Sequence, residues 1–200
     1  MEKKARIVVL GGGFGGLTAA QSLDRYLRKN RNVEIILINR TPNQVYLTQL
    51  HEIAGNRIPE DGVLYSLEAA LDQTRVKLVV DEIHKIDVKN RKLYGVDNEY
   101  SFDYLILACG SEPAFFDIPG MKENAFTLWS HEDAIKIRDH IVSMFEMASA
   151  EQDAEKRKEY LTFVVGGGGY TGIEMIGELV EWVEDLCIDY NIKASEVSLM

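Results

Sequence analysis

The 200-residue sequence has little cysteine, fewer positive charges (22 Lys and Arg) than negative ones (32 Asp and Glu), and no long apolar run. Its two cysteines, Cys109 and Cys187, form no CxxC pair, so neither a metal site nor a redox pair is indicated. The net charge of −10 argues against nucleic acid as a partner and against adhesion to anionic lipid. No stretch approaches the roughly 20 apolar residues of a membrane-spanning helix, and the N-terminal apolar stretch is too short for a signal peptide. We therefore expect a cytoplasmic location.

Glycine, by contrast, is concentrated in two places. Residues 7–16 read IVVLGGGFGG and residues 163–174 read FVVGGGGYTGIE. Each is a short apolar strand, then glycines at G-x-G-x-x-G spacing, then a helical pattern. The first glycine of such a motif makes the turn, the second lets a pyrophosphate approach the backbone, and the third packs the helix on the strand. The helix N-terminus offers N–H groups and a positive dipole end. Two copies in this context predict two bound dinucleotides, at Gly11, Gly13 and Gly16 and at Gly167, Gly169 and Gly172.

The second strand of the first unit, at 33–38, ends at Asn39, where an acidic residue usually holds the ribose hydroxyl. An asparagine both donates and accepts hydrogen bonds, so it can replace the acid without adding charge. The alternative is a turn-forming asparagine in the sequence NRTPN.

The rest of the chain predicts alternating helices and strands, which is typical of the α/β class. Ser130 and Asp133 form a capping-box pattern that begins a helix reaching about Ala150. The charged residues 149–160 predict a solvated helix end or linker. The remaining expected elements are a helix over 14–29, short helices at 47–54 and 64–72, a strand over 75–88 with a turn at Lys89-Asn90, a buried strand at 104–108, and a helix after Gly169. The apolar face expected for this last helix carries Ile173, Ile176, Val180, Val183 and Cys187. Another of its faces is expected to carry Glu174, Glu178, Glu181 and Asp185.

Few side chains are candidates for chemistry. Glu174 follows the second glycine motif and is either a carboxylate beside a nicotinamide ring or the start of an acidic solvent-facing stripe. His51 and Glu52 are either acid–base groups or a structural hydrogen bond. Cys109 follows an apolar strand and is expected to be packed rather than reactive, and Cys187 is expected in the core. The other histidines show no ligand spacing, so no metal is expected.

Four segments occur in the order of a known family: GGGFGG near the N-terminus, YLTQLHEIAG at 46–55, YLILACGSEPAFFDIPG at 104–120 and FVVGGGGYTGIEMIGEL at 163–179. Together they make the chain resemble the FAD-dependent pyridine-nucleotide oxidoreductases, and most closely the type II NADH:quinone oxidoreductases. The disulfide-reductase branch carries a CxxxxC motif where residues 41–60 here contain no cysteine, which excludes it. A sulfide-oxidising relative would also require cysteines near the flavin.

The resemblance implies a flavoprotein that passes two electrons from NADH through FAD to a quinone, with Glu174 near the nicotinamide–flavin junction. Cys109 stands where the family usually has Thr or Ala. The implied FAD contacts are Gly11, Gly12, Gly13, Phe14, Gly15, Gly16, Asn39, Arg40, Thr48, the backbone of Ile83, Ala108, Cys109 and Gly110. The implied NADH contacts are Gly167, Gly169, Tyr170, Thr171 and Gly172.

The expected fold is therefore α/β, with two Rossmann-like dinucleotide-binding units. An N-terminal FAD-binding domain covers 1–112, and an incomplete NAD(H)-binding domain covers 113–200. Family members are longer, so we expect a truncated form or broken reading frame that is inactive alone. The quinone pocket and a membrane-binding C-terminus would lie in the missing part. The parent would then be peripheral on the inner face of the cell membrane, and a homodimer is allowed.

Two other functions stay open on the sequence. One is another flavin enzyme with the same hydride step, either an NADH oxidase or a ferredoxin/rubredoxin reductase. The other is a dinucleotide-binding module that senses NADH without turnover.

Overall fold

A computed structural model describes residues 4–96 and 98–200 of the chain, which divide into two compact units. One unit holds the residues up to 45 together with 64–111, and the other holds 46–63 together with 112–200. Within the described residues, no helix is both long and apolar enough to cross a membrane.

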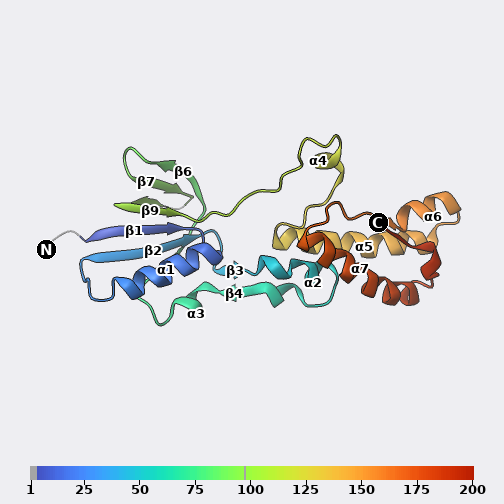
Figure 1. The fold of residues 1–200 in the computed structure, drawn as a ribbon, viewed down its shortest axis with the longest axis horizontal. Coiled ribbons are helices and arrows are strands. Elements are labelled where there is room, and N and C mark those ends of the chain that lie inside the picture. Colours follow the sequence, from blue (N-terminus) through green and yellow to red (C-terminus); the bar gives the residue numbers. More distant parts are fainter. Residues whose placement is uncertain (1–3, 97) are drawn as a thin grey trace. The chain divides into compact units, whose positions relative to one another are not determined.

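The first unit is built on a parallel sheet, which confirms the α/β class (Figure 1). The strand order is β5-β2-β1-β9, and Ile7 lies opposite both Ile35 and Tyr104. The crossover between β1 and β2 is the helix α1, as the sequence predicts. The bounds of these elements are β1 Ala5–Leu10, α1 Phe14–Tyr26, β2 Val33–Asn39, β5 Lys77–Val80 and β9 Tyr104–Leu107.

Both faces of this sheet are covered, which explains the unbroken apolar runs of its central strands. Val9 and Leu37 belong to a core cluster with Ala20 of α1 and with Leu67 and Leu71 of α3 (Leu67–Leu71). Side chains that alternate with these, from Val8, Leu10, Ile36 and Ile38, form a second cluster with Leu93 and Phe102. That second cluster lies toward an antiparallel sheet of β6 (Ile83–Asp87), β7 (Lys92–Gly95) and β8 (Glu99–Ser101).

The single strand expected over 75–88 is wrong, because β5 and β6 belong to different sheets. The chain changes sheet at Asp81, whose buried carboxylate accepts hydrogen bonds from the Val96 N–H at 2.9 Å and the Tyr100 hydroxyl at 2.6 Å. The predicted turn at Lys89-Asn90 is confirmed by the antiparallel pairing of β6 with β7.

The buried strand expected at 104–108 is also corrected. In the structure β9 pairs only with β1, and the side chains of Tyr104 and Leu107 are 64 % and 61 % exposed. An edge position explains this exposure, since the sequence pattern of an apolar strand does not reveal how many neighbours the strand has.

The second unit is mostly helical. The short helix α2 packs against α5 and α7, with Leu50, Ile53 and Ala54 buried. Residues 46–63 therefore lie in this unit, although they fall inside the continuous first domain expected from the sequence. The elements are η1 Leu47–Gln49, α2 Leu50–Ala54, η2 Glu60–Val63, α4 Met121–Asn124, α5 His131–Ala150, α6 Ala154–Tyr160, β10 Thr162–Phe163, α7 Tyr170–Asp189, η3 Ala194–Glu196 and β11 Ser198–Leu199.

Local signals set the helix ends in this unit. The Ser130–Asp133 capping box is present at the start of α5, which ends at Ala150 as predicted. The charged stretch 149–160 contains the end of α5 and then α6, where Arg157 donates to the Ala148 carbonyl and pairs with Glu196 at 2.8 Å. β10 and β11 pair in parallel, with α7 between them in the chain.

The buried face of α7 differs from the one predicted. Ile173 and Val180 are 62 % and 54 % exposed, whereas Glu178, expected on the acidic outer stripe, is 6 % exposed. A helix that carries apolar residues around most of its circumference leaves its buried face to be decided by its neighbours. The apolar residues that α7 buries are Met175, Leu179, Trp182, Val183, Leu186 and Cys187.

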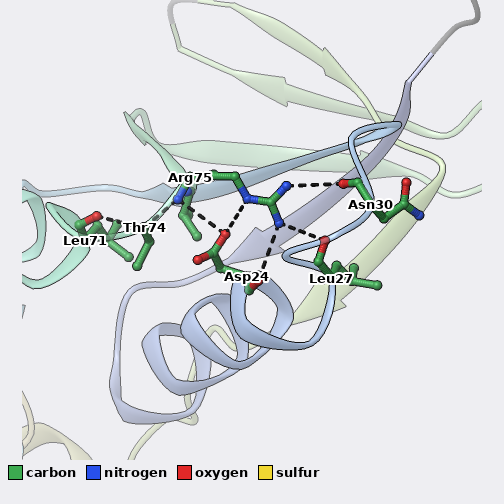
Figure 2. Close-up of polar contacts among 7 residues, drawn as sticks. Asp24, Leu27, Asn30, Leu71, Thr74 and Arg75 are labelled. Carbon is green, nitrogen blue, oxygen red and sulfur yellow. Dashed lines mark hydrogen bonds and ion pairs between the residues drawn. The ribbon is translucent and has the colours of Figure 1, made fainter.

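The side chain of one arginine donates hydrogen bonds to several acceptors at the C-terminal end of α1 (Figure 2). The Arg75 guanidinium donates to the nearly buried Asp24 carboxylate at 2.9 Å, and to the carbonyls of Leu27 at 3.0 Å and Asn30 at 3.2 Å. The nearly buried Asp24 carboxylate, the carbonyl of the C-cap residue Leu27 and the carbonyl of Asn30 beyond the helix thus share one charged donor.

Arg75→Met should therefore destabilise the first unit by about 2 kcal/mol, since it removes the charged donor of the nearly buried Asp24 carboxylate and the side-chain donor of the Asn30 carbonyl. Both tryptophans lie in the second unit, so urea unfolding should be followed by far-UV circular dichroism. Lys92→Met is the matched control, because its pair with Glu99 is exposed on both sides. Equal midpoints for the two variants would contradict the assigned role of Arg75.

Candidate functional site

The first glycine motif forms a tight strand-to-helix corner. Gly11 has φ +103°, a left-handed value that favours glycine, and a Cβ there would overlap the Ala108 carbonyl oxygen at the end of β9. A Cβ on Gly16 would overlap the carbonyl oxygen of Gly11. The first and third glycines are therefore required by the fold itself.

The second motif builds the same corner. Gly167 has φ +121°, Gly169 is the N-cap of α7 in an extended conformation, and a Cβ on Gly172 would overlap the carbonyl oxygen of Gly167. Gly13 is likewise the extended N-cap of α1. Both glycine runs predicted from the sequence thus lie at strand-to-helix corners.

The middle glycine of each motif borders open space. A Cβ added to Gly13 or to Gly169 would meet no atom within 4 Å. The first helical hydrogen bonds run from Leu17 to the Gly13 carbonyl and from Ile173 to the Gly169 carbonyl. The N–H groups just before those donors, which include Gly15, Gly16, Thr171 and Gly172, therefore have no intrahelical partner. Each corner presents N–H donors and a positive helix end, which fits a phosphate or diphosphate.

Asn39 holds the first corner in place. Its Oδ1 accepts a hydrogen bond from the Gly12 N–H at 2.8 Å, and its Nδ2 donates to the carbonyls of Thr41 at 2.9 Å and Asn43 at 3.3 Å. This geometry matches the turn-forming alternative, since the amide is already bonded on both sides. A contact between Asn39 or the exposed Arg40 and a ribose stays a prediction.

The other predicted FAD contacts are placed as follows. Ala108 lies against Gly11, and Ile83 is half-buried at the start of β6. Cys109 was expected to be packed, but it is exposed because β9 ends at Leu107; its Sγ is 3.7 Å from the Leu10 carbonyl oxygen. Gly110 is exposed next to it with φ +78°. Thr48 is exposed in η1 and belongs to the second unit.

Glu174 lies one turn into α7 rather than in its first turn. The Nδ1 atom of His51 is 3.4 Å from Glu174 Oε2, and its Nε2 atom is 3.9 Å from Glu178 Oε1. Glu52, the neighbour that the sequence suggested for His51, accepts a hydrogen bond from Gln49 instead. Sequence reasoning missed the true pairing, because it depends on how α2 docks against α7. The signal available was the pair of glutamates four residues apart on one helix.

Arg57 completes this cluster. Its Nε donates to Glu178 Oε2 at 2.9 Å and its Nη2 donates to Glu181 at 3.0 Å. A hollow of about 420 Å³ beside the cluster is lined by Arg57, Glu178, Glu181 and Trp182 among others, and by no residue of either glycine motif.

The two remaining questions from the sequence concern Cys187 and metals. Burial raises the pKa of the Cys187 thiol, which is in the core as predicted. Among residues 4–96 and 98–200, no group of three or more His, Cys, Asp or Glu side chains is arranged to hold a metal ion.

Known proteins are similar to this chain in both sequence and fold. The type II NADH:quinone oxidoreductase of Staphylococcus epidermidis strain ATCC 12228 is 34 % identical over 198 residues, which is 99 % of this chain and 48 % of that protein. The chain thus spans about half the length of the relatives it matches. The structure of NDH2 from Plasmodium falciparum in complex with NADH superposes with a TM-score of 0.85 at 22 % identity, covering 98 % of this chain and 41 % of the other.

The NADH:rubredoxin oxidoreductase of Clostridium acetobutylicum has the same fold, with a TM-score of 0.62 at 24 % identity over 90 % of this chain and 43 % of the other. The family model for pyridine nucleotide-disulphide oxidoreductases matches residues 5–194. Because this match includes both glycine corners and nearly the whole sequence, the chain belongs to the pyridine nucleotide-disulphide oxidoreductase family.

Proposed function

We propose that this chain is the dinucleotide-binding part of a flavoprotein in which NADH reduces FAD by hydride transfer and the electrons pass to a quinone. The observation that carries the proposal is the pair of glycine corners, which share one construction and each border open space at a helix N-terminus. Two such cradles suit two dinucleotides. The similarity to type II NADH:quinone oxidoreductases supports the choice of NADH, FAD and quinone.

The first corner fits the diphosphate of FAD, because open space borders Gly13 and a larger side chain at this position would fill it. We assign the diphosphate to the N–H groups of the α1 N-terminus, and the ribose side to the turn at Asn39 and Arg40. Because the Asn39 amide is engaged by Gly12, we propose that it acts by shaping the loop. Phe14, the backbone of Ile83, Thr48 and the segment from Ala108 to Gly110 complete the proposed FAD contacts.

The second corner is proposed to hold NADH through the backbone from Gly167 to Gly172, with Glu174 beside the nicotinamide. When bound, FAD supplies the hydride acceptor and the electron pair for the next acceptor. The protein groups bind, orient and hold protons. In these terms the FAD-binding and NAD(H)-binding parts correspond to the first and second compact units, and 46–63 packs within the second.

For the whole protein we propose quinone as the acceptor, at a peripheral site on the inner face of the cell membrane. A homodimer is compatible with this function.

Gly13→Val should weaken FAD binding at least about tenfold, a loss of about 1.4 kcal/mol. Gly13 has φ −71° and ψ −172°, an extended conformation that valine adopts readily, so the new side chain fills the diphosphate space without disturbing the corner. Titration of the chain with FAD, followed by quenching of flavin fluorescence, measures the change.

Gly16→Ala serves as the contrast, because its Cβ collides with the Gly11 carbonyl and should damage the fold itself. ADP, which carries a diphosphate, should compete with FAD, whereas riboflavin should not. Competition by riboflavin as strong as that by ADP would contradict a diphosphate cradle.

Anaerobic mixing of NADH with the FAD-loaded whole protein that contains this chain should bleach the flavin absorbance, and Gly169→Val should abolish the bleaching while FAD stays bound. Gly169 is extended and borders open space, so valine blocks the nucleotide rather than the fold. Stopped-flow absorbance measures the rate. Gly177→Ala, on the exposed side of the same helix, is the matched control and should bleach at the rate of the unsubstituted chain.

The same experiment separates the competing functions. FAD that binds but is never bleached by NADH would indicate a sensor without turnover. Once bleaching is seen, the oxidant that restores the colour, whether quinone, oxygen or an iron protein, identifies the acceptor.

A further inference from the structure

Two glutamates one turn apart on α7 have different surroundings. The Glu178 side chain is 6 % exposed and is bonded to Arg57, which also binds Glu181. The Glu174 side chain is 46 % exposed. A buried carboxylate is strongly disfavoured unless it is paired, so Glu178 is fixed by its arginine. Glu174 lacks such an enclosure.

The imidazole of His51 lies between these two carboxylates. Nδ1 faces Glu174 at 3.4 Å, Nε2 faces Glu178 at 3.9 Å, and the side chain is only 14 % exposed. Because its two nitrogens face oxygens one helical turn apart, the ring links the fixed carboxylate to the exposed one.

A glycine lets α2 bring His51 to this place. A Cβ on Gly55 would lie 2.5 Å from the Cβ of Glu178, so any side chain there would push α2 away from α7. The buried side chains of Leu50, Ile53 and Ala54 supply the packing that holds α2. The His51 ring is therefore held by a rigid backbone rather than by a loop.

We infer that His51 is a positioning residue, which orients the Glu174 carboxylate for the chemistry of the bound nicotinamide. The inference rests on the proposed function, which places Glu174 beside that ring. An exposed glutamate side chain samples several rotamers, and an imidazole Nδ1 atom 3.4 Å from Glu174 Oε2 selects one of them when it carries the proton. The contact of Nε2 with Glu178 fixes the ring from the other side, as a second partner does for other oriented imidazoles. A carboxylate that is already held in the reactive orientation does not lose side-chain rotational freedom on the way to the transition state.

The competing role for His51 is structural, as an ion-pair link that docks α2 on α7. The two roles depend on different nitrogens. Docking depends on the contact of Nε2 with the buried Glu178, whereas positioning depends on the contact of Nδ1 with Glu174.

Two conservative variants separate the roles, because the amide of asparagine can donate from near the Nδ1 position and that of glutamine from near the Nε2 position. In the FAD-loaded whole protein that contains this chain, the rate at which NADH bleaches the flavin should stay within about threefold of the original for His51→Asn, and should fall about tenfold or more for His51→Gln. The Kd for NADH should stay unchanged in both. Glu174→Gln should fall as far as His51→Gln, and the double variant no further. Equal rates for the two His51 variants, or a change in melting temperature alone, would overturn the inference.

A spectroscopic readout tests the same link without turnover. In ¹⁵N-resolved spectra of the His51 ring, adding NAD⁺ should move the Nδ1 resonance, and Glu174→Gln should remove that response. NAD⁺ that binds without moving the resonance would overturn the role of His51 and leave the proposed function standing. A chain that neither binds NAD⁺ nor is bleached by NADH would overturn both.

Discussion

In each unit the third glycine of a motif lies so close to the carbonyl oxygen of the first that a Cβ on it would overlap that oxygen, Gly16 with Gly11 and Gly172 with Gly167. This contact sets how near the helix can lie to the strand that precedes it. Once the helix is that near, its first turn follows directly on the end of the strand, and the glycine before that turn, Gly13 or Gly169, borders open space. The proposed anion site is therefore a consequence of the packing, and the same construction arises from GGGFGG and from GGGGYTG. Packing does not require the middle glycine, because a Cβ on Gly13 or Gly169 would meet no atom within 4 Å. We therefore attribute the glycine at this position to the proposed ligand.

The first corner is held by both neighbours of β1. β2 ends at Asn39, whose amide bonds the Gly12 N–H, and β9 leads into Ala108, whose carbonyl lies against Gly11. Parallel strands bring their carboxyl ends to one edge of the sheet, so these three chain segments meet there. A carboxylate at position 39 could accept from Gly12 but could not donate to the carbonyls of Thr41 and Asn43 as the amide does. The asparagine thus gives a more fully bonded turn than a carboxylate would, and it adds no charge.

Features that depend on local sequence were predictable, and features that depend on distant neighbours were not. The two glycine corners, the Ser130–Asp133 capping box and the turn at Lys89-Asn90 all follow from residues within a few positions of one another. The exposure of Cys109 and of β9 depends on how many strands flank that edge, which no local pattern encodes. The buried face of α7 and the pairing of His51 with Glu174 depend on how α2 packs against α7, and these two helices are more than a hundred residues apart in the chain. The candidate site was therefore predicted where backbone makes it and missed where side chains from distant segments meet.

Residues 46–63 bring α2 into contact with α7, which is distant in the sequence. Its two ends are paired in the antiparallel ladder of β3 (Asn43–Val45) and β4 (Leu64–Ser66) in the first unit, while α2 at its centre is buried in the second. Closing the ends removes most of the entropy that a free segment would lose on docking, and the cost grows only slowly with loop length. A five-residue helix, too short to be stable alone, can then be held by three apolar side chains and the pairing of Arg57 with Glu178. Because His51 lies on that helix, its contact with Glu174 depends on the packing of α2 in the core of the second unit.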